Sequence, residues 1–213
     1  MQQIYTIGHS AHSIKKFIEL LQRHEIEVVG DVRSQPYSTR FPQFSKESLQ
    51  ASLKSARIRY VFLGRELGAR REETECYVNG QAVYEKIAQL PAFTEGIARV
   101  LVGAHKYRVA LMCAEQDPLT CHRTILVCHE LKKHDVSIRH ISRTGILEDH
   151  QQTEQRLIEE ELGRTDQTDM FSKSEHPLMR LEQAYARRAS SIAYRQDKRS
   201  DDHSHDWIHT EVR

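Results

Sequence analysis

The sequence lacks a strong charge bias of either sign. Its 213 residues include 31 Lys and Arg against 30 Asp and Glu, which gives a formal net charge of +1. Residues 1–150 contain 21 of the basic and 17 of the acidic residues, and residues 151–213 contain the other 10 and 13. Neither part has the strongly basic balance that by itself indicates nucleic-acid binding. Composition therefore supports a nucleic-acid partner only weakly.

Long apolar runs are also missing, and cysteine is scarce. No run approaches the roughly 18 apolar residues that identify a membrane-spanning helix, so we expect no membrane partner. The first residues, Met-Gln-Gln-Ile-Tyr-Thr-Ile, have neither the basic nor the apolar region of a secretory signal. We therefore expect a cytoplasmic, reducing setting. In that setting the four cysteines are expected to be thiols: Cys76, Cys113, Cys121 and Cys128.

Short β-prone runs alternate with segments of helical periodicity, and no internal repeat is present. Strands are expected at residues 3–7, 26–32, 58–63, 107–113 and 136–141. This alternation predicts an α/β fold, a three-layer sandwich with a mainly parallel sheet of about five strands. Residues 1–150 are expected to form this domain. Residues 151–213 are expected to form a helical extension that ends in a disordered polar tail.

Side chains capable of chemistry follow three of the expected strands. The three strand ends are Gly8-His9-Ser10, Asp31-Val32-Arg33 and Cys113-Ala114-Glu115. In an open parallel sheet all carboxyl ends lie along one edge, and ligand sites of such folds sit at that edge. The sequence therefore predicts that these side chains share one rim.

The segment after the fourth strand is the most informative. Asp117 followed by Pro118 is typical of a helix N-cap with proline at the first helical position. The first turns of that helix, expected to extend to about residue 133, would contain Cys121, His122 and Arg123. Free amide groups, the helix dipole and Arg123 would favour an anion and lower the pKa of a nearby thiol.

Two further roles are open for Cys121. It is either a resolving thiol for Cys113 or, with Cys113, His122 and His9, a zinc ligand. Because the spacing of these residues matches no standard zinc pattern, we predict no metal and no cofactor. Of the other cysteines, Cys128 is expected to be structural and Cys76, in a charged loop, to be an exposed thiol.

The chain resembles the uncharacterised domain-of-unknown-function family 488. The resemblance spans about residues 6–147 and rests mainly on the block from Cys113-Ala114-Glu115 to Cys121-His122-Arg123. Its other motifs are Thr6-Ile-Gly-His-Ser10, Asp31-Val-Arg-Ser-Gln-Pro36, Ser38, Phe41, Phe44, Tyr60, Leu63-Gly-Arg-Glu-Leu-Gly68, His140-Ile141 and Gly145. The family implies a compact α/β fold but no established reaction. A more distant similarity connects the strand, Cys, loop, Arg and helix order with rhodanese-like sulfurtransferases and cysteine phosphatases. In those folds Cys and Arg are much closer together than Cys113 and Arg123, which are ten positions apart here.

These features favour a cysteine-dependent enzyme, a transferase or hydrolase. Its expected substrate is a small anion that carries phosphate or sulfur, with nucleotides among the candidates. Cys113 is the expected nucleophile or redox thiol, and His122 or His9 the general acid or base. Asp31 and Glu115 are expected to orient cations or move protons. The expected substrate-binding residues are Arg33, Arg123, Ser10, Pro36 and Tyr60. The alternatives are a nucleotide or nucleic-acid binding module with structural cysteines, and a scaffold whose residues 151–213 dock a partner protein.

Overall fold

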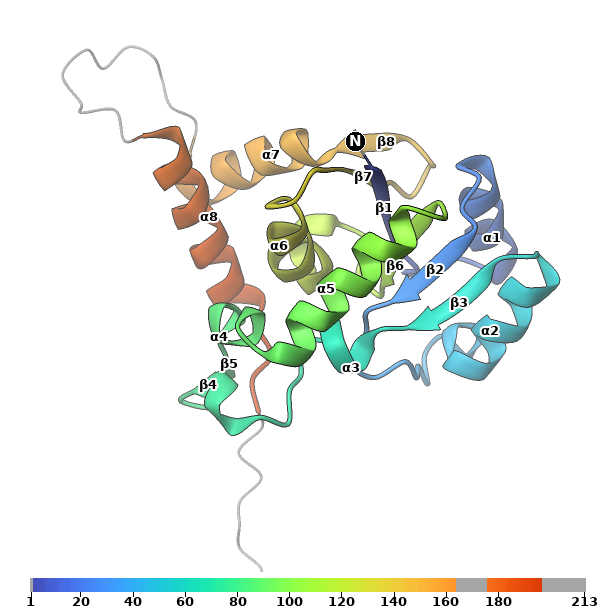
Figure 1. Ribbon diagram of the computed structural model, residues 1–213, viewed down its shortest axis with the longest axis horizontal. Coiled ribbons are helices and arrows are strands. Elements are labelled where there is room, and N and C mark those ends of the chain that lie inside the picture. The colour runs from blue at the N-terminus through green and yellow to red at the C-terminus, as the bar shows by residue number, and fades with distance from the viewer. Residues whose placement is uncertain (1, 164–175, 197–213) are drawn as a thin grey trace, which may run out of the picture.

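The computed structural model describes residues 2–163 and 176–196. Its centre is a six-stranded sheet with the order β3-β2-β6-β1-β7-β8 (Figure 1). The strands are β1 Gln2–Gly8, β2 Val28–Asp31, β3 Arg59–Phe62, β6 Val109–Cys113, β7 Val136–Ile141 and β8 Leu147–Asp149. The first five run parallel, and β8 pairs antiparallel with β7. The predicted α/β fold with a mainly parallel sheet is confirmed.

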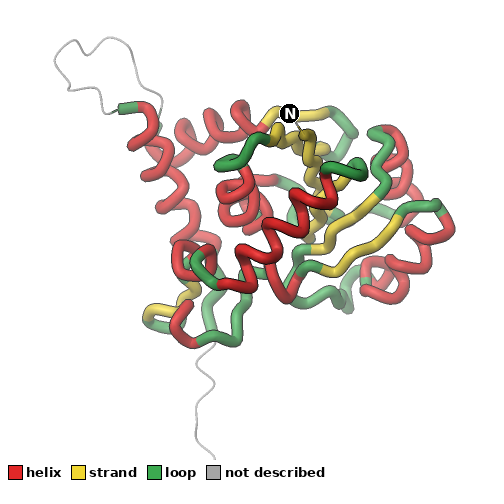
Figure 2. The backbone as a smooth tube through the Cα atoms, in the orientation of Figure 1, coloured by secondary structure: helices red, strands yellow, loops and turns green. Residues whose placement is uncertain are grey.

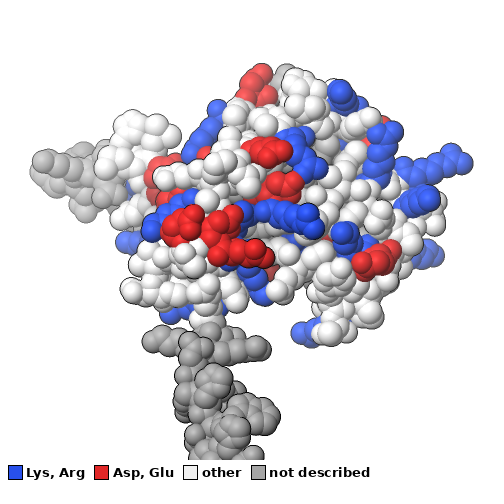
Figure 3. Space-filling view, turned by 60° about the horizontal axis from the view of Figure 1, so that its bottom comes forward, with Lys and Arg blue, Asp and Glu red and all other residues white. Residues whose placement is uncertain are grey.

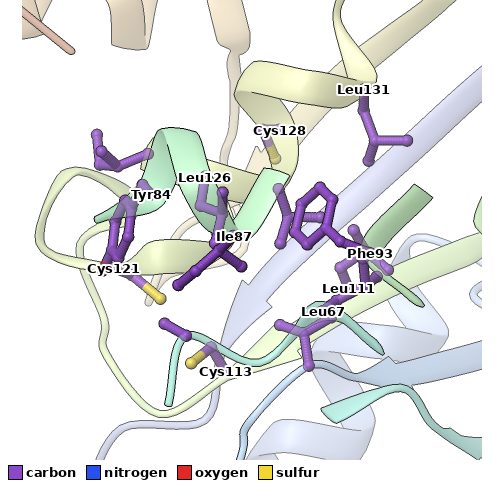
Figure 4. Packing of buried hydrophobic residues seen from close by; sticks show 14 of the residues in the cluster. Leu67, Tyr84, Ile87, Phe93, Leu111, Cys113, Cys121, Leu126, Cys128 and Leu131 are labelled. Carbon is purple, nitrogen blue, oxygen red and sulfur yellow. The ribbon is translucent and has the colours of Figure 1, made fainter. Parts of the chain in front are cut away.

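Helices cover both faces of the sheet, which makes three layers (Figures 1 and 2). On one face, α1 (Ile14–Arg23) and α2 (Lys46–Ser55) bury Phe17 and Leu49 against Tyr5 and Met112. On the other face, Leu111 joins a second core (Figure 4). That core is covered by α3 Gly64–Leu67, α4 Tyr84–Ala88, α5 Pro91–Ala104, α6 His129–Leu131, α7 His150–Leu162 and α8 Pro177–Ile192. A small hairpin, β4 Tyr77–Val78 and β5 Gln81–Ala82, precedes α4.

The centre of the sheet forms because β6 is apolar on both faces. All five of its residues are buried, as expected for a central parallel strand that has helices above and below. Alternate side chains enter the two cores, so Leu111 faces one and Met112 the other. The register pairs Gly8 of β1 with Cys113 of β6, and Asp31 of β2 with Met112. The three polar strand ends therefore stop at the same level of the sheet.

Three expectations about local structure need correction. The helix expected over 120–133 is shorter and is divided into a 3-10 turn at Pro118–Thr120, a π-helical stretch at Arg123–Cys128 and α6. Asp117 does cap the first of these, because its side chain accepts from the amide of Leu119. Strand β8 was not predicted, since three residues carry too little periodicity. Cys76 is fully buried in the second core rather than exposed.

The C-terminal extension packs on the domain through α7 and α8. Leu157, Ala184 and Tyr185 belong to the same buried cluster as Leu111. Both helices were expected from the apolar spacing, whereas the expected disordered tail, residues 197–213, lies outside the described residues. Among the described helices, none has the length and apolar character that crossing a membrane requires.

Candidate functional site

The loop that follows β6 lies directly against the loop that follows β1. The amide of His9 donates to the carbonyl oxygen of Cys113 over 2.9 Å, and the amide of Ser10 donates to that of Ala114 over 2.8 Å. Gly8 makes this approach possible, because a Cβ atom there would lie 1.8 Å from the carbonyl oxygen of Glu115. The expected common edge is therefore present, with the two strand ends bonded to each other.

Arg123 supports the loop after β6 through hydrogen bonds to its backbone. Its side chain is only 1% exposed, and Nη1 and Nη2 donate to the carbonyl oxygens of Glu115 and Gln116 over 2.6 and 3.1 Å. Its Nε contacts Oγ1 of Thr6 at 3.4 Å. The expected role of Arg123 as a direct anion ligand is not supported by these contacts, because its donors are used by the protein itself. Its charge still acts on the thiols described next.

Two thiols, a histidine and a carboxyl group meet at this edge. Sγ of Cys113 donates to Oε2 of Glu115 over 3.1 Å and lies 3.6 Å from Nδ1 of His122. Nε2 of His122 donates to the carbonyl oxygen of Val32 over 3.0 Å, so in the neutral ring Nδ1 is the free acceptor that faces Cys113. The amide of Arg123 donates to Sγ of Cys121 over 3.4 Å. Figure 4 shows the sulfur atoms of Cys113 and Cys121 facing each other.

The two thiols differ in pKa, and the shifts have opposite directions. Burial by itself would raise the pKa of Cys121, but the hydrogen bond from Cys113 and the charges of Arg123 and His122 hold it well below its usual value. Burial and the neighbouring Cys121 raise the pKa of Cys113 well above its usual value. Burial would lower the pKa of His122, yet the hydrogen bond and charge of Cys121 raise it. These shifts favour the thiolate at Cys121, the thiol at Cys113 and the protonated ring at His122.

The same environment favours the protonated form of the Glu115 carboxyl group. Burial raises the pKa of its carboxyl group, and the negative charge of Cys121 raises it further. A carboxyl group in that state can donate as well as accept a proton, which is the property that the sequence-based role for Glu115 requires.

Asp31 and Arg33 form a buried ion pair next to the thiols. Nε and Nη2 of Arg33 donate to the two carboxylate oxygens over 2.9 and 2.6 Å, and the hydroxyl of Tyr60 donates to Oδ2 over 2.8 Å. Nη1 of Arg33 lies 3.3 Å from Nε2 of His9, whose ring stacks on Phe44. Asp31 and Tyr60 therefore orient Arg33 instead of facing a ligand, and only Arg33 reaches the cavities.

Two adjoining cavities open at this edge. The first, of about 380 Å³, is lined by Cys113, His122, Glu115, Arg33 and Arg70, together with Ser34, Gln35, Tyr37, Ala69, Tyr84, Ala114, Thr120, Ile192 and Tyr194. The second, of about 480 Å³, is lined by His9, Ser10, Ala11, Ser38, Arg40, Phe41 and Gln116 and shares Arg33, Gln35, Tyr37, Ala114 and Glu115 with the first. The two cavities are therefore lobes of one cleft. Cys113 lines the first lobe and His9 lines the second.

The group that could hold a metal ion is Cys113, Cys121 and His122. One ligand atom from each lies within 4.8 Å of the other two. The carbonyl oxygen of Val32 accepts from Nε2 and so orients the His122 ring, as hydrogen-bond partners of metal-binding histidines do. The predicted absence of a metal rested on sequence spacing alone, whereas in the structure these three side chains are close enough to bind one ion.

A family model described as "Domain of unknown function DUF488" matches residues 13–129, which is more than half of the chain. The chain belongs to this family. The DUF488 match contains Asp31, Arg33, Cys113, Cys121 and His122, and it ends before α7 and α8 begin. No curated protein and no solved structure matches the chain. Family membership therefore confirms the resemblance and leaves the reaction to be argued from the site.

The DUF488 cleft contains residues that sequence reasoning did not place there. Tyr84 is 5% exposed and lines the thiol cavity, and Figure 4 shows its ring beside Cys121. Ile192 and Tyr194 come from beyond the family match. No local pattern marks these three, because they reach the cleft only through tertiary packing. Pro36, by contrast, is buried and lines neither cavity, and its carbonyl accepts from the amide of Lys46 over 2.8 Å.

Proposed function

We propose that this DUF488 protein is a thiol-dependent enzyme, a transferase or hydrolase, that acts on a small anionic substrate at the carboxyl edge of its sheet. One observation supports this function above the others. The sulfur of Cys113 lies on a cavity wall, 3.1 Å from the carboxyl group of Glu115 and 3.6 Å from Nδ1 of His122. Nucleophilic catalysis needs a thiol beside a base, and the base must be held in position by a third group. Here the base is His122, and the carbonyl of Val32 holds it.

The reaction would proceed through a covalent intermediate on Cys113. The thiol loses its proton to the neighbouring thiolate of Cys121 or to Nδ1 of a neutral His122, and the sulfur attacks the electrophilic atom of the substrate. A bond from sulfur to that atom forms as the bond to the leaving group breaks, and the leaving group takes a proton from His122 or Glu115. Water or a second substrate then attacks the intermediate and restores the thiol.

The cavity also has the charges needed to hold an anion. Arg33 and Arg70 both line it, and burial raises the pKa of the acidic group on its wall, Glu115. Because Asp31 neutralises much of the charge of Arg33, Arg70 is the stronger attractor. A substrate with a phosphate, sulfate, sulfonate or carboxylate group fits this balance.

Two alkylating agents of similar size but different charge test the proposal. Iodoacetamide is neutral, and iodoacetate carries the negative charge that the cavity should select. We expect native protein to be alkylated at Cys113, located by peptide mass spectrometry, with iodoacetate favoured at low salt and inorganic phosphate competing. Cys113→Ser should abolish this labelling. Cys128→Ser, at a buried thiol that lines neither cavity, is the matched control.

Two results would refute the proposal. Thiols that stay unreactive until the protein is denatured would rule out a nucleophilic cysteine. Equimolar zinc in the purified protein, lost in Cys113→Ser, Cys121→Ser and His122→Asn alike, would show that the cluster is a metal centre instead. Zinc analysis by mass spectrometry therefore accompanies the labelling.

A nucleotide-binding module with structural cysteines is the second candidate, and the second lobe of the cleft favours it. Tyr37 and Phe41 offer ring faces there beside Arg40. In that case Cys113→Ser would leave nucleotide affinity unchanged and Arg33→Ala would reduce it strongly. A nucleic-acid strand is less well matched, because the face in Figure 3 mixes basic and acidic side chains and shows no continuous basic track.

A further inference from the structure

The chain segment after α8 lines the thiol cavity through Tyr194 and is fixed to the β4–β5 hairpin. The amide of Ala82 donates to the carbonyl oxygen of Tyr194 over 2.9 Å, and the amide of Gln196 donates to that of Gly80 over 2.8 Å. Arg195 bridges to Gln81 in the antiparallel sense. These bonds hold the side chain of Tyr194 in one place on the cavity wall.

Helix α8 is also tied to the loop that connects Cys113 with Cys121. Nη1 of Arg188 donates to the carbonyl oxygen of Leu119 over 3.2 Å, two residues before Cys121. The same guanidinium pairs with Glu160 and Glu161 of α7 at 2.9 and 2.5 Å. The hairpin, α8 and the thiol loop therefore form one connected frame around the cavity.

Within this frame, Tyr194 lies under the guanidinium of Arg70. The Cζ atom of Arg70 is 4.6 Å from the centre of the Tyr194 ring, which is cation–π distance. Nη1 of Arg70 donates to Oε1 of Gln35 over 3.1 Å, and the backbone amide of Arg70 donates to Oγ of Ser34 over 2.9 Å. An exposed arginine would otherwise sample many rotamers, so these contacts keep its charge at the cavity.

Of the two arginines that line the thiol cavity, Arg70 is the one without a carboxylate partner among the described residues. Arg33 is paired with Asp31 at 2.6 Å, and Arg71 with Glu73 at 2.7 Å. The charge of Arg70 is therefore the one left to interact with a ligand on that side of the cavity. Because Arg70, Glu115 and Cys113 line the same cavity, an anionic group bound to Arg70 would keep the rest of a small substrate within the cavity that Cys113 lines.

We infer that Arg70 is the principal anion-binding residue of the thiol cavity and that Tyr194, from outside the family match, is its positioning residue. The ligand class is a small oxyanion such as phosphate, sulfate or a carboxylate. This inference deepens the proposed function and rests on it for the identity of the cavity. It also gives the C-terminal extension a role in selecting the substrate.

The test uses the full chain and two probes that report separately on anion binding and on thiol chemistry. Binding of inorganic phosphate is followed by chemical-shift titration in amide NMR spectra at constant ionic strength. The ratio of the iodoacetate rate to the iodoacetamide rate at Cys113 is measured by mass spectrometry. The variants are Arg70→Gln, Tyr194→Ala, Tyr194→Phe and the Arg70→Gln/Tyr194→Ala double variant. Arg65→Gln is the matched control, since Arg65 is an exposed arginine that lines neither cavity.

We expect Arg70→Gln to weaken phosphate binding and to lower the alkylation ratio about tenfold, the usual effect of losing a charge-assisted bond. Tyr194→Ala should lower both about threefold, the effect of one cation–π contact, and Tyr194→Phe should restore both. In the double variant the effect should be no larger than in Arg70→Gln alone, because Tyr194 acts through Arg70. Arg65→Gln should leave both readouts near the wild-type values.

Three outcomes would overturn the inference. The first is that Arg70→Gln changes neither phosphate binding nor the alkylation ratio. The second is that the effect of Tyr194→Ala adds fully to that of Arg70→Gln. The third is that the wild type does not bind phosphate. If the thiols are inert but phosphate binding depends on Arg70 and Tyr194, the thiol enzyme is refuted and the anion-binding role of Arg70 stands. If the thiols are reactive but do not depend on Arg70, the anion-binding role is refuted and the thiol enzyme stands.

Discussion

His122 and Cys113 are in contact through the ring nitrogen that the backbone leaves free. Nδ1 of His122 lies 3.6 Å from Sγ of Cys113, and Nε2 is held by the carbonyl oxygen of Val32. Val32 follows β2 directly, and Cys113 ends β6, so the pairing of these two strands sets the distance between thiol and imidazole.

The first prediction concerns His122. In His122→Asn, alkylation of the native thiols by iodoacetamide at pH 7 should slow at least about tenfold, because the imidazolium that favours a thiolate is lost. The pH at which the rate is half-maximal should rise for the same reason, since the charge of His122 lowers the pKa of Cys121. Stopped-flow rates between pH 5 and 10 give both quantities. His134→Asn, at an exposed histidine that does not line the cleft, should behave as wild type.

The second prediction concerns the close contact at Gly8. Gly8→Ala would bring a Cβ atom to 1.8 Å from the carbonyl oxygen of Glu115, and backbone atoms cannot yield as a flexible side chain can. We expect about 3 kcal/mol lower unfolding free energy in urea, or failure to fold. Gly103→Ala in α5 has its nearest contact at 3.7 Å and should stabilise the protein by about 0.5–1 kcal/mol. Equal effects of the two substitutions would contradict the close packing of the two loops.

The third prediction concerns Arg123, which we assign to supporting the loop after β6. Arg123→Met would leave the carbonyl oxygens of Glu115 and Gln116 without their donors, so stability should fall by about 3 kcal/mol. Arg65→Met, at an exposed residue whose side chain makes no hydrogen bond or ion pair within the described residues, should change stability by less than about 0.5 kcal/mol. Urea unfolding measures both. A stable Arg123→Met protein that had lost only anion binding would restore the ligand role expected from the sequence.

The fourth prediction concerns acid sensitivity. Burial and the charge of Arg33 lower the pKa of His9 from 6.5 to about 4, so the folded protein binds no proton there until the pH approaches 4. The unfolded chain takes up that proton near pH 6.5, and stability is therefore full above this pH and is lost as the pH falls toward 4. His9 alone should account for about 2 kcal/mol of the loss between pH 7 and 4.5.

The comparison that isolates His9 is His9→Gln, which cannot titrate in this range. Its unfolding free energy should fall less between pH 7 and 4.5 than that of the wild type, although buried His140 and His150 have lowered pKa values and keep titrating in both proteins. Parallel curves for the two proteins would show that His9 is not held neutral in the fold.

Much of the secondary structure followed from local sequence. The apolar run at Val109–Cys113 identified the central strand, and the spacing of Phe17, Leu20 and Leu21 identified a helix with one buried face. Local sequence failed for Cys76, where charged neighbours suggested exposure. Glu75 is exposed and Glu73 pairs with Arg71, while the thiol of Cys76, directly after Glu75, packs into the core, and only the packed neighbours decide this difference.

The same division applies to the site. The sequence by itself placed Cys113, His122, Arg33 and Glu115 at one sheet edge, because parallel strands end together and their next residues must meet there. Tertiary structure decided which of these side chains face the cavity and which stand behind it. It placed Arg123 on backbone carbonyls, Asp31 and Tyr60 behind Arg33, and Tyr194 under Arg70. Such roles depend on contacts between residues far apart in the chain, and periodicity, which is a local property, does not encode those contacts.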